Sequence, residues 1–200
     1  MSAVLAPTPV STDIDVLQRV AQQRRSIYSY LDTPVSRQVV ERAIECAVLA
    51  PNHHRTRPWR FFVFAADARH RLAAAYETAA RRLGRDAERA IQRALDAPVM
   101  IVVGCAASAS NPRVEQKEEE FAVAASIENM MLALAAEGVG TLLTTGVLAE
   151  SDEVHRLVGL TPPEARIMGV VNVGYRNTER PLLARPAADG ASVTRWMDAA

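Results

Sequence analysis

The sequence predicts a single α+β domain in which one β-sheet is covered by helices on both faces. The chain has 200 residues, and 49% of them are hydrophobic, so it can bury a core of ordinary size. Segments typical of strands are separated by longer segments with helical periodicity. Residues 99–105 (VMIVVGC) are almost continuously apolar, which indicates a central strand covered on both faces.

Local signals place the individual elements. The predicted helices carry apolar side chains at helical spacing and begin at capping residues. They are a first helix from Thr12 or Asp13 to about Arg25, a second from Ser36 to before Pro51, two between residues 67 and 96 with a break near Gly84, a long one over 121–136, and a short one from Ser151 to Gly159. The predicted strands, rich in β-branched and aromatic residues, are 59–65, 99–105, 140–145 and 166–173. Gly138 is expected to end the long helix in the left-handed conformation.

We expect a flexible tail over residues 1–12, one domain over 13–180 and a C-terminal extension over 181–200. Leu182, Leu183 and Trp196 are the apolar anchors of that extension, which either wraps a partner subunit or stays mobile. The helix 121–136 is apolar on almost every side, and such a helix is buried by a sheet, by other helices or by a second subunit.

The composition favours a small-molecule partner over a macromolecular one. Lys plus Arg and Asp plus Glu both number 23, so the charge predicts no binding to nucleic acid or to an anionic membrane. The arginines between residues 81 and 93 alternate with acids, which is typical of a solvated helix surface; they are Arg81, Arg82, Arg85, Arg89 and Arg93. The apolar run 121–136 is shorter than the roughly 20 residues that cross a bilayer. Two unpaired cysteines and no signal-peptide pattern favour the cytoplasm.

Several common chemistries lack their motif. Gly138 and Gly140 begin like a dinucleotide fingerprint, but they follow a helix and the third glycine is missing. The four histidines have no metal-binding spacing, so no metal is predicted. Cys105 lies in an apolar strand, where an inert thiol is the common case, and we expect no catalytic residue from the protein itself.

Two polar segments remain as candidate binding sites. Arg24, Arg25 and Ser26 offer two guanidinium forks and a hydroxyl, which match a phosphate monoester, although an arginine pair alone is more often surface charge. Residues 50–59 (APNHHRTRPW) place polar donors between a proline and a strand, where a rigid base fixes their position.

These segments together resemble the nitroreductase family in type, order and spacing. The resemblance rests on RRSIYSYLDTPVS, APNHHRTRPWRFFVF and AASIENMMLALAAEGVG and covers most of residues 16–175. It implies a three-layer α/β/α fold with a mixed, mainly antiparallel sheet, and an intertwined homodimer with two FMN sites lined by both chains. The nearest type is a compact bacterial branch with a histidine in the first flavin loop.

By match to the family motifs, each part of the cofactor has predicted contacts. Arg24, Arg25 and Ser26 would hold the FMN phosphate and ribityl oxygens, and Arg176 is a further phosphate candidate. His53 would reach the flavin from the other subunit, and Leu49 belongs to the same predicted set. Leu143, Thr144 and Thr145 would lie beside the flavin ring, where fixed hydrogen bonds assist reduction.

The resemblance implies that NADH or NADPH reduces the flavin and that a small electron-poor acceptor reoxidises it in a ping-pong cycle. Three alternatives stay open. The chain could be a flavin sensor or carrier without turnover, it could use the same fold for dehalogenation or flavin breakdown, or it could be a cofactor-free dimer in which Arg24 and Arg25 pair with acids. Dehalogenating relatives usually have a lid, for which the predicted loop 106–112 is short.

The sequence departs from the family in the loop before the first strand. Many members have Ser and Asn there and Gln before the Pro-Trp pair, whereas this chain has His53, His54 and Arg57. The charge of Arg55 or Arg57 either favours an anionic acceptor or faces solvent, and we favour solvent.

Overall fold

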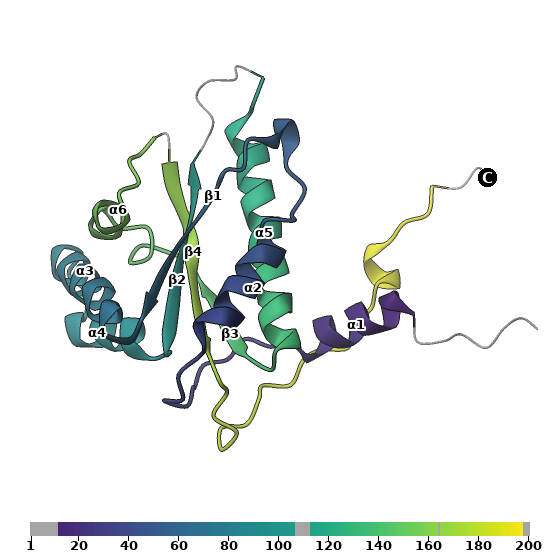
Figure 1. Ribbon diagram of the computed structural model, residues 1–200, viewed down its shortest axis with the longest axis horizontal. Coiled ribbons are helices and arrows are strands. Elements are labelled where there is room, and N and C mark those ends of the chain that lie inside the picture. The colour runs from purple at the N-terminus through teal and green to yellow at the C-terminus, as the bar shows by residue number, and fades with distance from the viewer. Residues whose placement is uncertain (1–11, 107–112, 164, 198–200) are drawn as a thin grey trace, which may run out of the picture.

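A four-stranded antiparallel sheet forms the centre of the molecule (Figure 1). The computed structural model describes residues 12–106, 113–163 and 165–197, so the predicted tail up to residue 11 and loop residues 107–112 lie outside it. The strand order is β1-β2-β4-β3. The strands are β1 (Trp59–Ala65), β2 (Val99–Ala106), β3 (Gly140–Thr144) and β4 (Ala165–Gly174), each within one residue of its predicted bounds. Within the described ranges, parallel pairing is limited to an isolated bridge between Ser26 and Thr141.

Helices cover both faces of the sheet and produce three layers (Figure 1). One face carries α2 (Arg37–Ala47) and α5 (Gln116–Ala136). The other carries α3 (Arg69–Arg82), α4 (Ala87–Leu95) and α6 (Asp152–Val158). Short 3-10 turns lie at η1 (His53–Arg55), η2 (Ala66–Ala68) and η3 (Ala191–Val193). The first helix, α1 (Asp13–Gln23), projects from the layers and buries none of its residues.

The sequence signals for helix ends are confirmed. The Ser36 and Ser151 hydroxyls accept hydrogen bonds from the backbone N–H of Val39 (3.3 Å) and Val154 (3.4 Å), as capping residues do. Gly138 follows α5 with φ +74°, a conformation that favours glycine. α5 itself begins at Gln116, five residues before the predicted start, because the apolar pattern did not reveal its polar first turn.

Alternating side chains of β2 supply two separate cores, because neighbouring residues of a strand face opposite sides of the sheet. Ile101 and Val103 pack toward α2 and α5, against residues such as Val123 and Leu134. Met100 and Val102 belong to the core on the α3, α4 and α6 side. The predicted central strand, covered on both faces, is confirmed: β2 is buried through Cys105.

The prediction of a solvated helix surface is confirmed, since all five arginines are exposed, but some of them also have neighbours that the sequence did not reveal. Arg82 donates from Nε and Nη2 to the two carboxylate oxygens of Glu153, at 2.9 and 3.0 Å, and so joins α3 to α6. The Arg82 guanidinium lowers the pKa of Glu153 to about 2. Arg89 and Arg93 line a cavity beside β3. Local charge alternation cannot reveal such contacts, because they depend on how distant helices pack. No helix in the described part of the chain is long and apolar enough to cross a bilayer.

Candidate functional site

The segment after α1 lies along the outer edge of the sheet and places the predicted phosphate residues beside β3. The Ile27 N–H donates to Thr141 O at 2.9 Å, and Tyr30 forms an isolated antiparallel bridge with Arg176 after β4. Gly140 permits this close approach, since a Cβ atom there would lie 2.7 Å from Cγ1 of Ile27. Arg24, Arg25 and Ser26 are therefore brought near Arg176, as predicted for one binding site.

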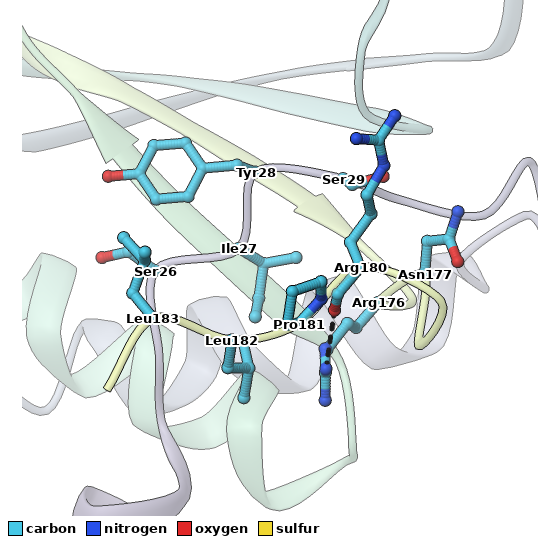
Figure 2. Close-up of a pocket in the computed structure, with 10 residues that line it drawn as sticks. All are labelled: Ser26, Ile27, Tyr28, Ser29, Arg176, Asn177, Arg180, Pro181, Leu182 and Leu183. Atoms are coloured by element: carbon cyan, nitrogen blue, oxygen red, sulfur yellow. Dashed lines mark hydrogen bonds between the residues drawn. The ribbon is translucent and has the colours of Figure 1, made fainter. Parts of the chain in front are cut away.

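A cleft of about 540 Å³ opens on one side of this segment (Figure 2). Its walls are the residues Ser26 to Ser29 on one side and Arg176 with the chain from Arg180 to Leu183 on the other. A smaller cleft of about 250 Å³ is lined by Arg24, Arg25 and Arg176, so Arg176 borders both. The start of the C-terminal extension thus contributes to the walls of the candidate site.

Two of the guanidinium groups keep an uncompensated charge. Arg176 Nη2 donates to the backbone carbonyl of Arg180 at 2.9 Å, and Arg25 Nη2 donates to the carbonyl of Leu183. Within the described ranges neither makes an ion pair, and the Ser26 hydroxyl makes no hydrogen bond. Arg24 differs, because its Nε lies 3.5 Å from the Glu128 carboxylate. Arg25, Arg176 and Ser26 therefore remain available to an anionic group such as a phosphate.

The residues predicted beside the flavin ring line an adjoining cavity of about 490 Å³. Leu143, Thr144 and Thr145 contribute to its wall, and Tyr28 borders both this cavity and the 540 Å³ cleft. The Thr144 hydroxyl donates a hydrogen bond to Val170 O at 3.1 Å, which holds this side chain against β4. Seven of the nine predicted cofactor contacts therefore lie along one edge of the molecule, around the start and end of β3.

Leu49 and His53 are not brought to that edge. The loop that carries His53 is attached near the start of α5 through Glu119, whereas the 250 Å³ cleft includes Ala135 near the end of α5. The helix rise of 1.5 Å per residue separates these two positions by about 24 Å. Leu49 follows the end of α2, where Cys46 O accepts from Asn129 Nδ2 near the middle of α5 at 3.4 Å. The side chains of Leu49 and His53 are both exposed, with Leu49 at 78%. Within one chain, Leu49 and His53 therefore do not line the clefts that the other seven residues border.

Comparison with known proteins identifies the family. The profile of the "Nitroreductase family" matches residues 21–175, which is more than half of the chain and includes eight of the nine candidate residues. The chain belongs to the nitroreductase family. The ninth residue, Arg176, is the first position after the matched range.

Relatives and solved structures agree with the nitroreductase assignment. The putative NAD(P)H nitroreductase YdjA of Escherichia coli is 27% identical over 164 residues, which span 80% of this chain and 88% of YdjA. A nitroreductase-like protein from Bacillus cereus has the same fold, with a TM-score of 0.80, 22% identity and coverage of 97% of this chain and 100% of that one. A putative nitroreductase of Desulfovibrio desulfuricans in complex with FMN gives a TM-score of 0.69 at 22% identity. The match covers 91% of this chain and 96% of that one.

In this nitroreductase chain a buried carboxylate fixes the His53 loop, a contact that sequence reasoning missed. Glu119 is fully buried on α5, and its Oε1 accepts from the Thr56 hydroxyl at 2.5 Å and from Asn52 Nδ2 at 3.4 Å. Asn52 Oδ1 accepts from the Arg57 N–H at 2.7 Å. These bonds hold a backbone with positive φ at the three non-glycine residues His54, Arg55 and Arg57, which is costly without such support.

Several other residues that line the two larger cavities were not predicted from the sequence. They are Tyr28, Tyr30, Tyr76, Arg89, Arg93, Asn172, Asn177 and Arg180. Tyr28, Tyr30 and Asn177 adjoin motif residues and were within reach of the sequence argument. Asn172 is the one polar residue in the otherwise apolar stretch of β4 from Ile167 to Val173, which was a usable signal.

A cysteine nucleophile is not supported by the surroundings of Cys105. Burial, together with the nearby Glu119 and Glu120, raises the pKa of the Cys105 thiol to about 11. The thiol is therefore protonated at neutral pH and unreactive.

Proposed function

We propose that this protein is an FMN-dependent oxidoreductase that passes electrons from NADH or NADPH to a small electron-poor acceptor. The observation that carries the proposal is the pair Arg25 and Arg176, whose charges no carboxylate of the described chain neutralises, beside Ser26 at the edge of β3. A cluster of this kind recognises a phosphate monoester. The names of the relatives support the choice, since YdjA is called an NAD(P)H nitroreductase and the Desulfovibrio structure contains FMN.

The residues present fit FMN in each of its parts. Arg25, Arg176 and Ser26 would hold the phosphate, with Arg24 at the same end of the site. Leu143, Thr144 and Thr145 would line the ring, in the cavity that Tyr28 shares with the phosphate cleft. The side-chain oxygen of Thr141, which borders the phosphate cleft, is buried without a hydrogen-bond partner and is free for a ligand.

A homodimer would complete this site. Leu49 and His53 of a second copy would reach the cofactor, since within one chain neither residue lines the clefts beside β3. The surface supports such pairing: α1 projects from the layers with Ile14 and Leu17 exposed, and Phe121 on α5 is 66% exposed (Figure 1). Exposed apolar side chains such as these can be buried when two subunits pair.

Bound FMN would supply the redox chemistry, taking a hydride from NAD(P)H and passing it to the acceptor in a ping-pong cycle. The protein would supply position and electrostatics: cations at the phosphate end and fixed backbone groups of residues 143–145 at the ring. No side chain is required as a catalytic acid. The two cysteines, both free, fit a reducing compartment, which we propose is the cytoplasm.

Fluorescence titration of FMN with the purified protein tests the binding step. Flavin emission should be quenched and saturate at one FMN per chain, because each dimer would hold two sites. Inorganic phosphate should compete weakly, since it occupies only the arginine end of the site. Emission that stays unchanged at high protein concentration would overturn the assignment of FMN.

A further inference from the structure

The cavity beside β3, in which the proposed function places the flavin ring along Leu143, Thr144 and Thr145, also has lining residues that the FMN assignment does not use. It lies between the segment after α1, helices α3 and α4, and strands β3 and β4, and encloses about 490 Å³. Its wall combines apolar and aromatic side chains with a comparable share of polar groups, which can orient a small organic molecule. The lining residues used below are Tyr28, Tyr30, Tyr76, Arg89, Arg93 and Asn172.

Two guanidinium groups face this cavity without a protein partner. Arg89 and Arg93 are four residues apart on α4, so they lie on the same side of the helix. Within the described part of the chain neither side chain makes a hydrogen bond or ion pair. Asp96 also borders the cavity, and its carboxylate accepts a hydrogen bond from Gln92 at 3.1 Å. One carboxylate against two guanidinium groups leaves the cavity wall with a net positive charge.

Two buried polar groups in the same cavity also have no partner. Asn172 is 5% exposed, and its side-chain oxygen makes no hydrogen bond; the hydroxyl of Tyr30 is likewise buried and unpaired. Buried polar atoms are usually paired, because leaving them unpaired costs stability. Both groups line the cavity, so a bound molecule can complete their hydrogen bonds.

We propose that this cavity binds a small aromatic carboxylate, with the acid held by Arg89 and Arg93 and the ring among the tyrosines. An arginine fork matches a carboxylate geometrically, and the ring would be covered by Tyr28 and Tyr76. A polar substituent on the ring would meet Asn172 and the Tyr30 hydroxyl. Leu143, Thr144 and Thr145 line the same cavity, so, resting on the proposed function, the aromatic acid is the electron acceptor.

Isothermal titration of the FMN-loaded protein with para-nitrobenzoate and with its methyl ester tests the charge requirement without any variant. The acid should bind at least tenfold more tightly than the ester, because only the acid can pair with the two arginines. Equal affinities for acid and ester would overturn the proposal.

Substitution locates the bound acid. The double variant Arg89→Gln/Arg93→Gln should bind the acid at least tenfold more weakly than the wild type and should bind the ester with unchanged affinity. Arg85→Gln is the control, because its exposed side chain does not line the cavity, and it should bind both ligands as the wild type does. Unchanged acid affinity in a folded double variant would contradict the assignment of these residues.

Flavin binding is measured separately on the same preparations. Absence of flavin binding overturns the proposed oxidoreductase, and the acid and ester can still be compared on the FMN-free protein. Normal flavin binding without preference for the acid overturns the aromatic-acid site alone.

Discussion

At the scale of single residues, the candidate site depends on which charges remain uncompensated. Arg24 lies beside Glu128, whereas Arg25 and Arg176 hydrogen-bond only backbone carbonyls within the described ranges. A backbone carbonyl leaves the positive charge of a guanidinium intact, and a carboxylate neutralises it. Arg25 and Arg176 therefore contribute more to anion binding than Arg24 does.

Replacing Arg25 by Ala should weaken FMN binding by about 30-fold, which corresponds to about 2 kcal/mol for a lost charge-assisted contact. Arg71→Ala on the exposed side of α3 is the matched control and should leave the affinity unchanged. Fluorescence titration measures both constants. An Arg25 variant that binds FMN as tightly as the control would remove this residue from the site.

At the scale of elements, much of the fold was predictable because its signals are local. Ser36, Ser151 and Gly138 mark helix ends through hydrogen bonds and conformations that involve only a few neighbouring residues. The pairing of Arg82 with Glu153 was not predictable, since these residues are 71 positions apart and meet only when α3 packs on α6. The burial of Glu119 likewise depends on how α5 meets the His53 loop.

The His53 loop should loosen when its central hydrogen-bonding residue is removed. Asn52→Ala loses the bonds to Arg57 N–H and to Thr56, so amide hydrogen exchange over residues 52–57 should accelerate on the order of tenfold. Gln38→Ala, exposed on α2, provides the comparison. Unaltered exchange in the Asn52 variant would show that the backbone of the loop is held by other contacts.

The contact between α3 and α6 should make stability depend on pH. The pKa of Glu153 is about 2 in the folded protein against an ordinary value of 4.5, so its carboxylate stabilises the fold above about pH 4.5. This contribution is lost as the pH falls through about 2, where the folded carboxyl takes up its proton. Arg82→Gln should therefore be less stable than the wild type at neutral pH, and the difference should shrink in acid.

Urea unfolding across this pH range measures that difference. Arg81→Gln, whose partner Glu77 is on the same helix, is the control and should show a smaller effect because its ion pair is exposed. A gap between wild type and Arg82→Gln that is unchanged down to pH 2 would contradict the assigned pairing.

At the scale of the whole molecule, the central feature is that the His53 loop and the 250 Å³ cleft lie near opposite ends of α5 within one chain. The resemblance implied a shared site, and the positions of His53 and Arg25 in one chain agree with that arrangement. The mass in solution should be twice the chain mass of 21.8 kDa. The residues that line the 490 Å³ cavity beside β3 could not be predicted from the sequence, because α4 and β4 come together there only in the folded chain.

Mixed dimers test the shared site. Arg25→Ala damages the phosphate end of a chain's own site, and His53→Trp would obstruct the site of its partner. After mixing and subunit exchange, each heterodimer regains one intact site, so about a quarter of all sites should bind FMN tightly if chains pair at random. No recovery after demonstrated exchange would mean that Arg25 and His53 do not serve the same site across the dimer.

The most direct test of the proposed activity is the anaerobic absorbance spectrum of the FMN-saturated protein before and after addition of NADH, and separately of NADPH. We predict bleaching of the flavin band near roughly 450 nm by at least one of the two donors, since the oxidoreductase must accept a hydride before it can pass electrons on. A bound flavin that neither donor bleaches would contradict the oxidoreductase and favour a sensor or carrier.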